Sequence, residues 1–305
     1  MIKIFSTIAV LAAATLVVVI NYKNTTGGPS KELTVIGGLE INRKATTGDQ
    51  MIIADGLILD LNANYGVITH GIKVFKWENQ VKSHAIKSFQ NKGKVSSPTL
   101  KLESKNNGGN NAVVFDHQSL VCLEEGAADY IVKGSGYTWL SIMSVKEQNG
   151  VKQYMQGFFG NIGENRPFFG IMAGFKDDNT PWLGARIRAK KPETFWNQYS
   201  SPYAMASSPL ETDKYYIIIG RMSEGTDNAQ IDLFVNSGDK VNSKNVRVYK
   251  DSTPSSLTIG KLRPTFRRES FIGEISRFLL YDRPLETLEI NENVNFLINQ
   301  YSIDL

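Results

Sequence analysis

From Met51 onward the chain is a succession of short apolar or alternating segments, each ended within a few residues by glycine, asparagine or aspartate. Segments of this kind are typical of strands, and the gaps between them have the size of hairpin loops. We expect strands at Gly56–Asn62, Val74–Trp77, Ala112–Phe115, Thr138–Val145, Gly157–Gly160, Phe168–Phe175, Trp182–Lys190, Tyr215–Met222, Ala229–Val235, Ser256–Gly260 and Phe271–Tyr281. So many short strands predict an all-β fold in which two sheets pack as one sandwich, rather than a parallel α/β sheet.

One helix is predicted, at the C-terminal end of the chain. Apolar side chains recur there at the spacing that places them on one helix face: Ile290, Val294, Leu297, Ile298 and Tyr301. Glu286 and Glu289 fall in the first turn, where the positive end of the helix dipole favours carboxylates. We expect this helix to cover an edge or a face of a sheet.

The last strand, a tight stop and this helix follow one another without a linker from Ser270 to Tyr301. This order, with F-x-G-x-I-x-x-F-x-x-Y-x-R-x-L in the strand, resembles the ending of the LamG-like, concanavalin A-like jelly rolls. Three earlier segments resemble strands of bacterial members of that superfamily, in the right order: Asp55–Ala63, Val74–Gln80 and Ala112–Asp116. The resemblance implies a two-sheet concanavalin A-like jelly roll. Many members of the superfamily only bind sugars or proteins, and a minority are enzymes.

The N-terminal residues are of a different kind. Ile4–Ile20 is almost wholly apolar, and a membrane-spanning helix needs about 17–25 such residues. The run ends in large aliphatic residues, which suit a signal peptidase badly, so we expect an uncleaved signal-anchor over residues 1–23, with a cleaved signal peptide as the alternative. Residues 24–50 are expected to be a linker and a loose extension, and residues 51–305 the jelly-roll domain. The domain would be exported, either anchored at the cell surface or in the periplasm, or secreted.

Composition narrows the possible partners and sites. The 305 residues are 41% hydrophobic and 21% charged, with a formal net charge of +4, which is too small to indicate a nucleic-acid partner. Cys122 is the only cysteine and lies in an apolar run, so we expect a buried, inert thiol and no intrachain disulfide. With His70, His84 and His117 the only histidines, a histidine-built metal site is not expected.

The strand Trp182–Lys190 provides the sharpest prediction of a site. Its odd positions are all apolar, and a period of two places its even positions on the opposite, open face. Those even positions hold the predicted ligand-binding side chains Trp182, Arg186, Arg188 and Lys190.

The turn-like sequence before this strand predicts a hairpin with Phe168–Phe175. Matching the apolar faces of the two strands gives three outward pairs: Gly174 with Gly184, Met172 with Arg186, and Gly170 with Arg188. Small residues beside long cations would make a shallow trough with a positive wall. Such a trough suits an acidic or hydroxyl-rich polymer, because guanidinium groups bind carboxylate and sulfate bidentately. The alternative is a plain solvated outer face.

A long loop, residues 191–213, follows the hairpin and contains Phe195, Trp196, Tyr199 and Tyr203. Loops of this length in compact domains are usually functional or disordered. Exposed rings are a common platform for sugars, because they offer flat apolar area with a polar edge. We therefore add Trp196 and Tyr199 to the predicted ligand site. The alternative is that the rings only hold the loop against the sandwich.

The turn between the two strands is rich in oxygen ligands. Asp177, Asp178 and Asn179 carry the carboxylate and amide oxygens that hard cations prefer. LamG-like domains often hold calcium in such loops, so the resemblance implies a possible calcium site here. Aspartate and asparagine are also common turn formers, and a turn without calcium is the alternative.

Motifs of jelly-roll enzymes are incomplete in this chain. Glycoside hydrolases need two carboxyl groups on one strand, and Gln230–Phe234 has one acid. The lyase motif Q-[IV]-H has an aspartate, Asp232, in place of its histidine. Of the sialidase motif S-x-D-x-G-x-T-W, only the last four positions are matched, by Gly136–Trp139. No catalytic residue is therefore predicted.

We expect an exported, membrane-tethered jelly roll that binds a glycan, acidic in kind, without cleaving it. One alternative is a polysaccharide lyase or glycoside hydrolase of the same fold, in which Tyr216 or another tyrosine would be the base of a lyase. A second alternative is an adhesive protein-binding module, as laminin-type relatives are.

Overall fold

The computed structural model describes short segments near the N-terminus and most of the chain from residue 52 onward. The described residues are 18–20, 32–36, 39–43, 52–92, 96–124, 126–132, 135–146, 156–160, 170–176, 178–186, 203–224, 229–246, 256–261 and 270–304. The chain divides into two compact units, Met1–Gln50 and Met51–Leu305. Each unit has its own sheet structure.

The first unit contains three antiparallel strands with β2 in the centre. They are β1 (Val18–Ile20), β2 (Glu32–Ile36) and β3 (Leu39–Arg43). A linker and a loose extension were expected over residues 24–50, and the described residues there form the strands β2 and β3, in which apolar and polar residues alternate with the period of a strand. Residues 4–17 of the apolar run and residues 24–30 of the expected linker lie outside the described residues. Among the helices that are described, none is long and apolar enough to cross a membrane.

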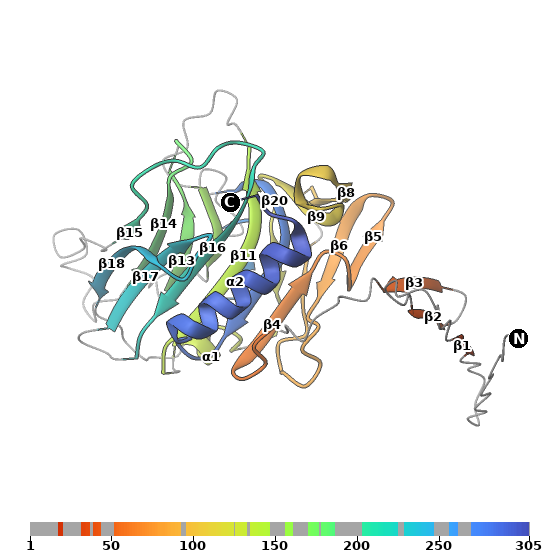
Figure 1. Cartoon of the computed structure of the whole chain (residues 1–305), viewed down its shortest axis with the longest axis horizontal. Coiled ribbons are helices and arrows are strands. Elements are labelled where there is room, and N and C mark those ends of the chain that lie inside the picture. Colours follow the sequence, from red (N-terminus) through yellow and green to blue (C-terminus); the bar gives the residue numbers. More distant parts are fainter. Residues whose placement is uncertain are drawn as a thin grey trace, which may run out of the picture. The chain divides into compact units, whose positions relative to one another are not determined.

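The second unit contains two antiparallel sheets. In the first sheet β20 is central: β11 pairs along one side, and β4 and β9 share the other side (Figure 1). Strands β16, β17 and β18 follow beyond β11, and β8 follows beyond β9. The strands of this first sheet are β4 (Leu57–Asn62), β8 (Thr99–Ser104), β9 (Asn110–Asp116), β11 (Tyr137–Val145), β16 (Tyr215–Met222), β17 (Ala229–Val235), β18 (Lys240–Val246) and β20 (Ile272–Tyr281).

The second sheet has the strand order β5-β6-β7-β10-β19-β12-β13-β14-β15. Its strands are β5 (Val67–His70), β6 (Lys73–Glu78), β7 (Ser88–Gln90), β10 (Leu120–Cys122), β12 (Gln156–Gly160), β13 (Gly170–Phe175), β14 (Pro181–Arg186), β15 (Tyr203–Met205) and β19 (Thr258–Ile259). One pairing, Lys73 with Thr99, joins β6 to β8 and links the two sheets.

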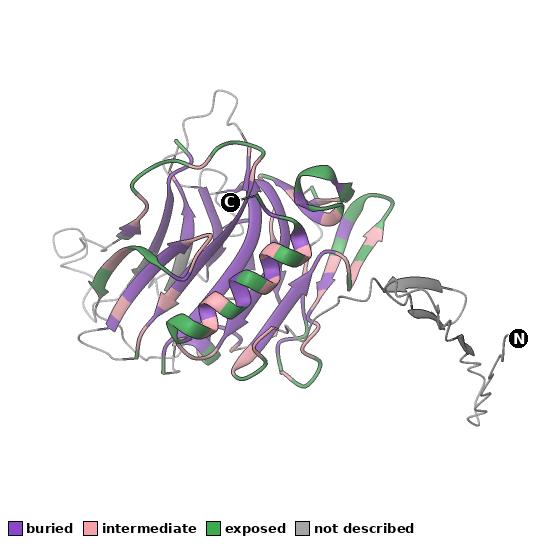
Figure 2. Ribbon diagram, viewed as in Figure 1, coloured by how far each residue is buried: buried purple, intermediate pink, exposed green. Residues whose placement is uncertain are grey.

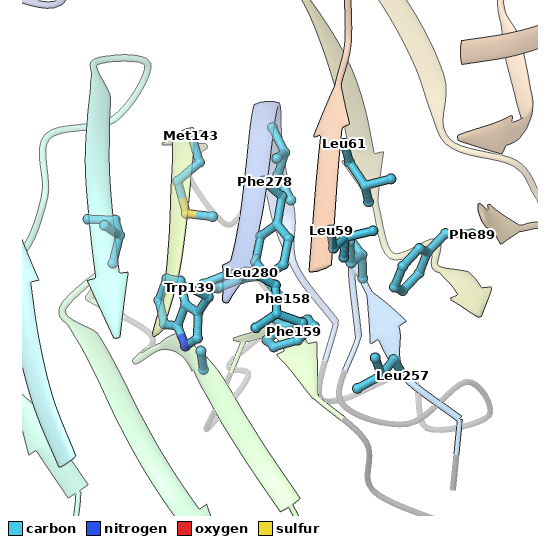
Figure 3. Packing of buried hydrophobic residues seen from close by; sticks show 14 of the residues in the cluster. Leu59, Leu61, Phe89, Trp139, Met143, Phe158, Phe159, Leu257, Phe278 and Leu280 are labelled. Carbon is cyan, nitrogen blue, oxygen red and sulfur yellow. The ribbon is translucent and has the colours of Figure 1, made fainter. Parts of the chain in front are cut away.

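The hydrophobic core draws side chains from both sheets. Figure 3 shows Leu59, Trp139 and Phe278 of the first sheet together with Phe89 and Phe158 of the second. Trp139 stands edge-on to Phe158 with ring centroids 5.2 Å apart, a geometry that aromatic pairs favour. The protein is therefore an all-β, two-sheet jelly-roll sandwich, as the sequence predicted.

Helix α2 (Thr287–Tyr301) covers the outer face of the first sheet (Figures 1 and 2). A capping box begins it: the Glu286 side chain accepts from the Glu289 backbone N–H, and the Glu289 carboxylate accepts from the Glu286 N–H at 2.8 Å. Its buried side chains join an apolar cluster with outward residues of β11, β16 and β20: Ile290, Val294, Leu297, Tyr301, Leu140, Ile142, Ile217, Ile219, Leu279 and Tyr281. The predicted position and role of this helix are confirmed. The shorter helices are η1 (Lys105–Asn107) and α1 (Asp129–Val132).

Candidate functional site

Strands β13 and β14 form the hairpin that the sequence predicted. The Lys176 N–H donates to the Thr180 carbonyl at 3.0 Å, and the Asn179 N–H donates to the Lys176 carbonyl at 3.0 Å. Asn179 has a φ of 64°, in the left-handed region that asparagine tolerates better than most residues. These backbone hydrogen bonds between Lys176, Asn179 and Thr180 therefore close the hairpin, with a left-handed residue at the end of the turn, a common hairpin arrangement.

The register of this hairpin differs by two residues from the predicted one. The observed outward pairs are Gly170 with Arg186, Met172 with Gly184, and Gly174 with Trp182. The difference arises because the left-handed Asn179 closes a tighter turn than the sequence analysis assumed. A shift of two leaves every residue on its predicted face, because side chains alternate with a period of two. Gly170 is therefore still paired with an arginine across the strands, and that arginine is Arg186 instead of Arg188.

The side chains of this hairpin that were predicted to face the core do so wherever they are described. Ala173 and Phe175 of β13 and Leu183 of β14 are fully buried in the core between the sheets. These side chains fix the hairpin against the sandwich and set the direction of its other face.

Trp182 does not lie on an open face as expected, because its side chain is only 3% exposed. A Cβ added at Gly174 would collide with the Gln156 carbonyl oxygen and come within 2.9 Å of the Trp182 ring. The indole therefore packs against the glycine across the hairpin instead of projecting into solvent. As a contact for a ligand, Trp182 stays a prediction.

Four other predicted ligand residues lie outside the described residues: Arg188, Lys190, Trp196 and Tyr199. Strand β14 ends at Arg186, and the next described strand, β15, begins at Tyr203. Tyr203 of β15 pairs with Gly184 of β14. Phe195 of the aromatic loop also lies outside the described residues.

The described oxygens of the predicted calcium turn are engaged within the protein. The Asp178 carboxylate accepts from the Thr180 N–H at 2.9 Å, and hydrogen bonds from Thr180 hold the pKa of Asp178 below its usual value. The Asn179 side-chain oxygen accepts from Gln156 Nε2 at 3.3 Å. Asp177 lies outside the described residues. The described part of the chain holds no cluster of three or more His, Cys, Asp or Glu side chains suited to a metal, and the calcium site stays a prediction.

Sequence reasoning missed a set of buried charges on the outer face of the first sheet. Arg277 donates to both carboxylate oxygens of Asp60, at 3.0 and 2.8 Å, and to the Gln300 side chain of α2 at 2.8 Å. Both charged residues are almost fully buried. Such bidentate pairs are strong only while both partners are present. The pair fastens the helix to the sheet.

Glu274 is the centre of a second buried group. Its carboxylate accepts from Lys101 at 2.9 Å and from the Tyr215 hydroxyl at 2.6 Å, and Lys146 lies 3.1 Å away. Burial acts to raise the pKa of Glu274, but the donors outweigh it and hold that pKa below the usual glutamate value. The carboxylate is therefore ionised and fully engaged by cations.

Asp232, the single acid of the strand tested for hydrolase motifs, is the centre of a third group. Arg221 donates to it at 3.1 and 2.8 Å, the Ser243 hydroxyl donates to it at 2.7 Å, and Lys240 lies 3.6 Å away. The signal for all three groups is a charged residue at an outward position of a long apolar strand. From the sequence alone, such a residue cannot be recognised as buried, because its burial depends on the elements that cover the strand.

The described residues form no arrangement of side chains that supports a lyase or a hydrolase. Tyr216, the expected base of a lyase, has its ring in the main core, and its hydroxyl accepts from the Glu211 N–H at 3.1 Å. The structure does bring Asp116, His117 and Ser270 together, with His117 Nδ1 2.7 Å from the Ser270 hydroxyl and Nε2 3.7 Å from Asp116. Ser270 is fully buried, so its oxygen is not placed to attack a substrate.

Comparison with known proteins finds structural relatives only. No family model matches the sequence, and no curated protein matches it. A Trypanosoma rangeli sialidase in complex with 2,3-difluorosialic acid matches with a TM-score of 0.52 and 12% identity, over 99% of this chain and 45% of the sialidase. The protein thus spans less than half the length of that sialidase chain.

Two further solved structures are similar over parts of the chain. A heptameric SAP-like pentraxin from Limulus polyphemus matches with a TM-score of 0.38 and 17% identity, over 52% of this chain and 68% of the pentraxin. The binding domain of botulinum neurotoxin serotype G matches with a TM-score of 0.47 and 14% identity, over 79% of this chain and 51% of that domain. At these identities the likeness concerns the fold alone.

Proposed function

We propose that the protein is an exported, non-catalytic glycan-binding protein whose ligand is an acidic polysaccharide. The observation that carries the proposal is the pairing of Arg186 with Gly170 across the β13–β14 hairpin. Because Gly170 has no side chain, we expect space on this part of the hairpin for a flat, charged sugar ring. Arg188, Lys190, Trp196 and Tyr199 complete the proposed contact surface, because the segment that carries them begins and ends beside β14.

The distribution of carboxylates supports binding over cleavage. Retaining glycosidases need two carboxyl groups about 5 Å apart that flank the bond to be cut. In the described part of the chain, the buried carboxylates Asp60, Asp232 and Glu274 are each bound by an arginine or by lysines on the first sheet. These carboxylates are engaged by cations of the protein itself, and the proposed ligand face belongs to the other sheet.

The likeness to a sialidase that is seen with a sialic acid derivative adds limited support. That sialidase, which contains a similar fold, is seen with an acidic sugar derivative bound. The activity of the whole sialidase is not carried over, because this protein spans less than half of it.

The proposal is tested by incubating the full chain with a panel of acidic polysaccharides and one neutral polysaccharide at low salt. We expect retention on one or more acidic polymers, weaker retention in high salt, and no change in the polymer. Ultraviolet absorbance from an unsaturated product would instead show a lyase, and new reducing ends would show a hydrolase. Neither retention nor turnover would favour the adhesive protein-binding alternative.

For the N-terminal segment we propose an uncleaved anchor. Its large aliphatic exit residues, Val18–Ile20, suit a signal peptidase badly. Fractionation of producing cells should recover the full-length mass with the membranes. A mature protein that begins after about residue 20 and is found in the soluble exported fraction would show a cleaved signal instead.

A further inference from the structure

Exposed apolar side chains are concentrated on the β5–β6 hairpin and the strand beside it. Ile72, at the turn of the hairpin, is 67% exposed, and Leu102 of β8 is 65% exposed. Ile68 and Phe75 are also exposed, and together these four residues make up the apolar tip. The other large exposed apolar residues of the described chain are Tyr65, Leu123, Tyr130, Val241 and Leu288, and they lie outside this hairpin turn and β8.

A backbone contact places the turn of the hairpin beside β8. Residues 71 and 72 form the turn between β5 and β6, and the Ile72 carbonyl accepts from the Leu100 N–H at 2.7 Å. Leu102 lies two residues further along β8. Figure 2 shows the turn end of this hairpin as exposed. The tip is a projection and not a groove, because its most exposed residue stands at the turn itself.

The charge of the tip is positive. Residues 65–76 contain Lys73, Lys76 and His70 and no acid. Lys76 is paired with Glu78 at 2.9 Å, whereas Lys73 is exposed and enters no ion pair with a described residue. Glu103 and Lys105 follow on β8 and η1 and offset each other.

We propose that the apolar tip docks on an anionic lipid bilayer, so that the domain itself meets a membrane surface. Burial of Ile72, Leu102 and Phe75 at the headgroup boundary removes their apolar area from water. Lysines beside such residues are attracted to the negative surface potential, and their long side chains reach the headgroups. A projecting apolar turn flanked by lysine is complementary to such a surface in both shape and charge.

A local fluorescent label tests the proposal in the full chain. Ile72→Cys is labelled with an environment-sensitive thiol dye, and Leu288→Cys, on α2, is the matched control because Leu288 is 69% exposed. Native Cys122 is buried, and burial raises the pKa of its thiol, so the dye goes to the introduced cysteine. The readout is local, and binding through the N-terminal run therefore does not produce it.

We expect a blue shift of the label at position 72, and none at position 288, on adding phosphatidylcholine vesicles that contain phosphatidylglycerol. Vesicles of phosphatidylcholine alone should give a weaker shift, and high salt should reduce it. Adding Lys73→Ala to the labelled chain should raise the lipid concentration at half-maximal shift about fivefold. A label at Leu102→Cys should respond like the one at position 72.

Three outcomes would overturn the proposal. The first is no shift at either tip position, and the second is an equal shift at position 288. The third is a label at position 72 that is already blue-shifted before vesicles are added, because the tip would then be covered by another copy or by the chain's own N-terminal unit. A shift without vesicles that grows with protein concentration identifies the second copy.

Discussion

The outer faces of the two sheets differ in how they are covered. The outer face of the first sheet is covered by α2, and its buried charges Asp60, Glu274 and Asp232 are all bound by cations. The described part of the second sheet has no such helix. At its β13–β14 hairpin an arginine faces a glycine, and at its β5–β6 hairpin apolar side chains remain exposed.

The difference shows how to assign a role to a charged residue on a strand. Arg277 and Arg186 look alike in sequence, since each is a single arginine in a strand rich in apolar residues. Arg277 is held bidentately by Asp60 beneath a covering helix, so its charge is used for stability. Arg186 lies on the sheet to which we assign the ligand, and we expect its charge to be used for binding. The following predictions test this division, beginning with the largest effect.

Arg277→Ala should destabilise the protein by about 3–5 kcal/mol, because it leaves the buried Asp60 carboxylate without its partner. Denaturant unfolding of the full chain measures the loss. The matched control is Asp60→Asn combined with Arg277→Met, which removes both charges and should cost less than the single change. A single variant as stable as wild type would show that the covered face is not held by this pair.

Trp182→Ala should destabilise by about 3 kcal/mol, the low end of the range for truncating a buried aromatic residue. The indole is 3% exposed and packs on Gly174, so its first role is to fill space in the hairpin. Thermal melting measures the effect, with the exposed Tyr65→Ala as control. A normal melt for Trp182→Ala would mean that the tryptophan is free to serve a ligand, as the sequence first suggested.

Glu289→Ala should destabilise by about 1 kcal/mol, because it removes half of the capping box of α2. The same carboxylate also accepts from Arg283 at 2.6 and 2.8 Å, a partly exposed pair that adds little. Glu292→Ala, an exposed glutamate of the same helix, should leave the melting temperature unchanged. Equal changes in melting temperature for the two variants would show that the capping box does not stabilise helix α2.

Lowering the pH should destabilise the folded protein through protonation of Glu274, which lies on the outer face of the first sheet. Its pKa is lowered in the folded protein, so the resulting stability is present above the ordinary glutamate value of 4.5 and is lost as the pH falls through the lower folded value. Melting temperatures measured from pH 5 downward should therefore fall less steeply in Glu274→Gln than in wild type. Parallel slopes for the two proteins would exclude a contribution from this carboxylate.

The fold was predictable because its main signals are local. Strands such as β11 and β20 are long and apolar, and the C-terminal helix has both its periodic face and its capping acids in one short stretch. The strands that the sequence analysis missed include β5 and β7, which are short, and β8 and β18, which are rich in polar residues. Their pairing depends on neighbours far away in the chain.

The candidate site was predictable only in part, for two physical reasons. The faces of β13 and β14 follow from alternation, but their register depends on whether Asn179 adopts a left-handed conformation, which sequence alone does not fix. The burial of charges depends on distant partners: Asp60 and Arg277 are 217 residues apart. A single sequence therefore could not separate a structural arginine from a binding one.

The most direct test of the account measures stability and binding together for two arginine variants of the full chain. We predict that Arg186→Ala with Arg188→Ala melts like wild type and binds the acidic polysaccharide about tenfold more weakly, since each exposed charged hydrogen bond contributes toward the low end of about 1.5–3 kcal/mol. Arg277→Ala should melt early and, at a temperature where it is folded, bind like wild type. A double variant that melts normally and binds as tightly as wild type would contradict the assignment of the ligand to the β13–β14 hairpin.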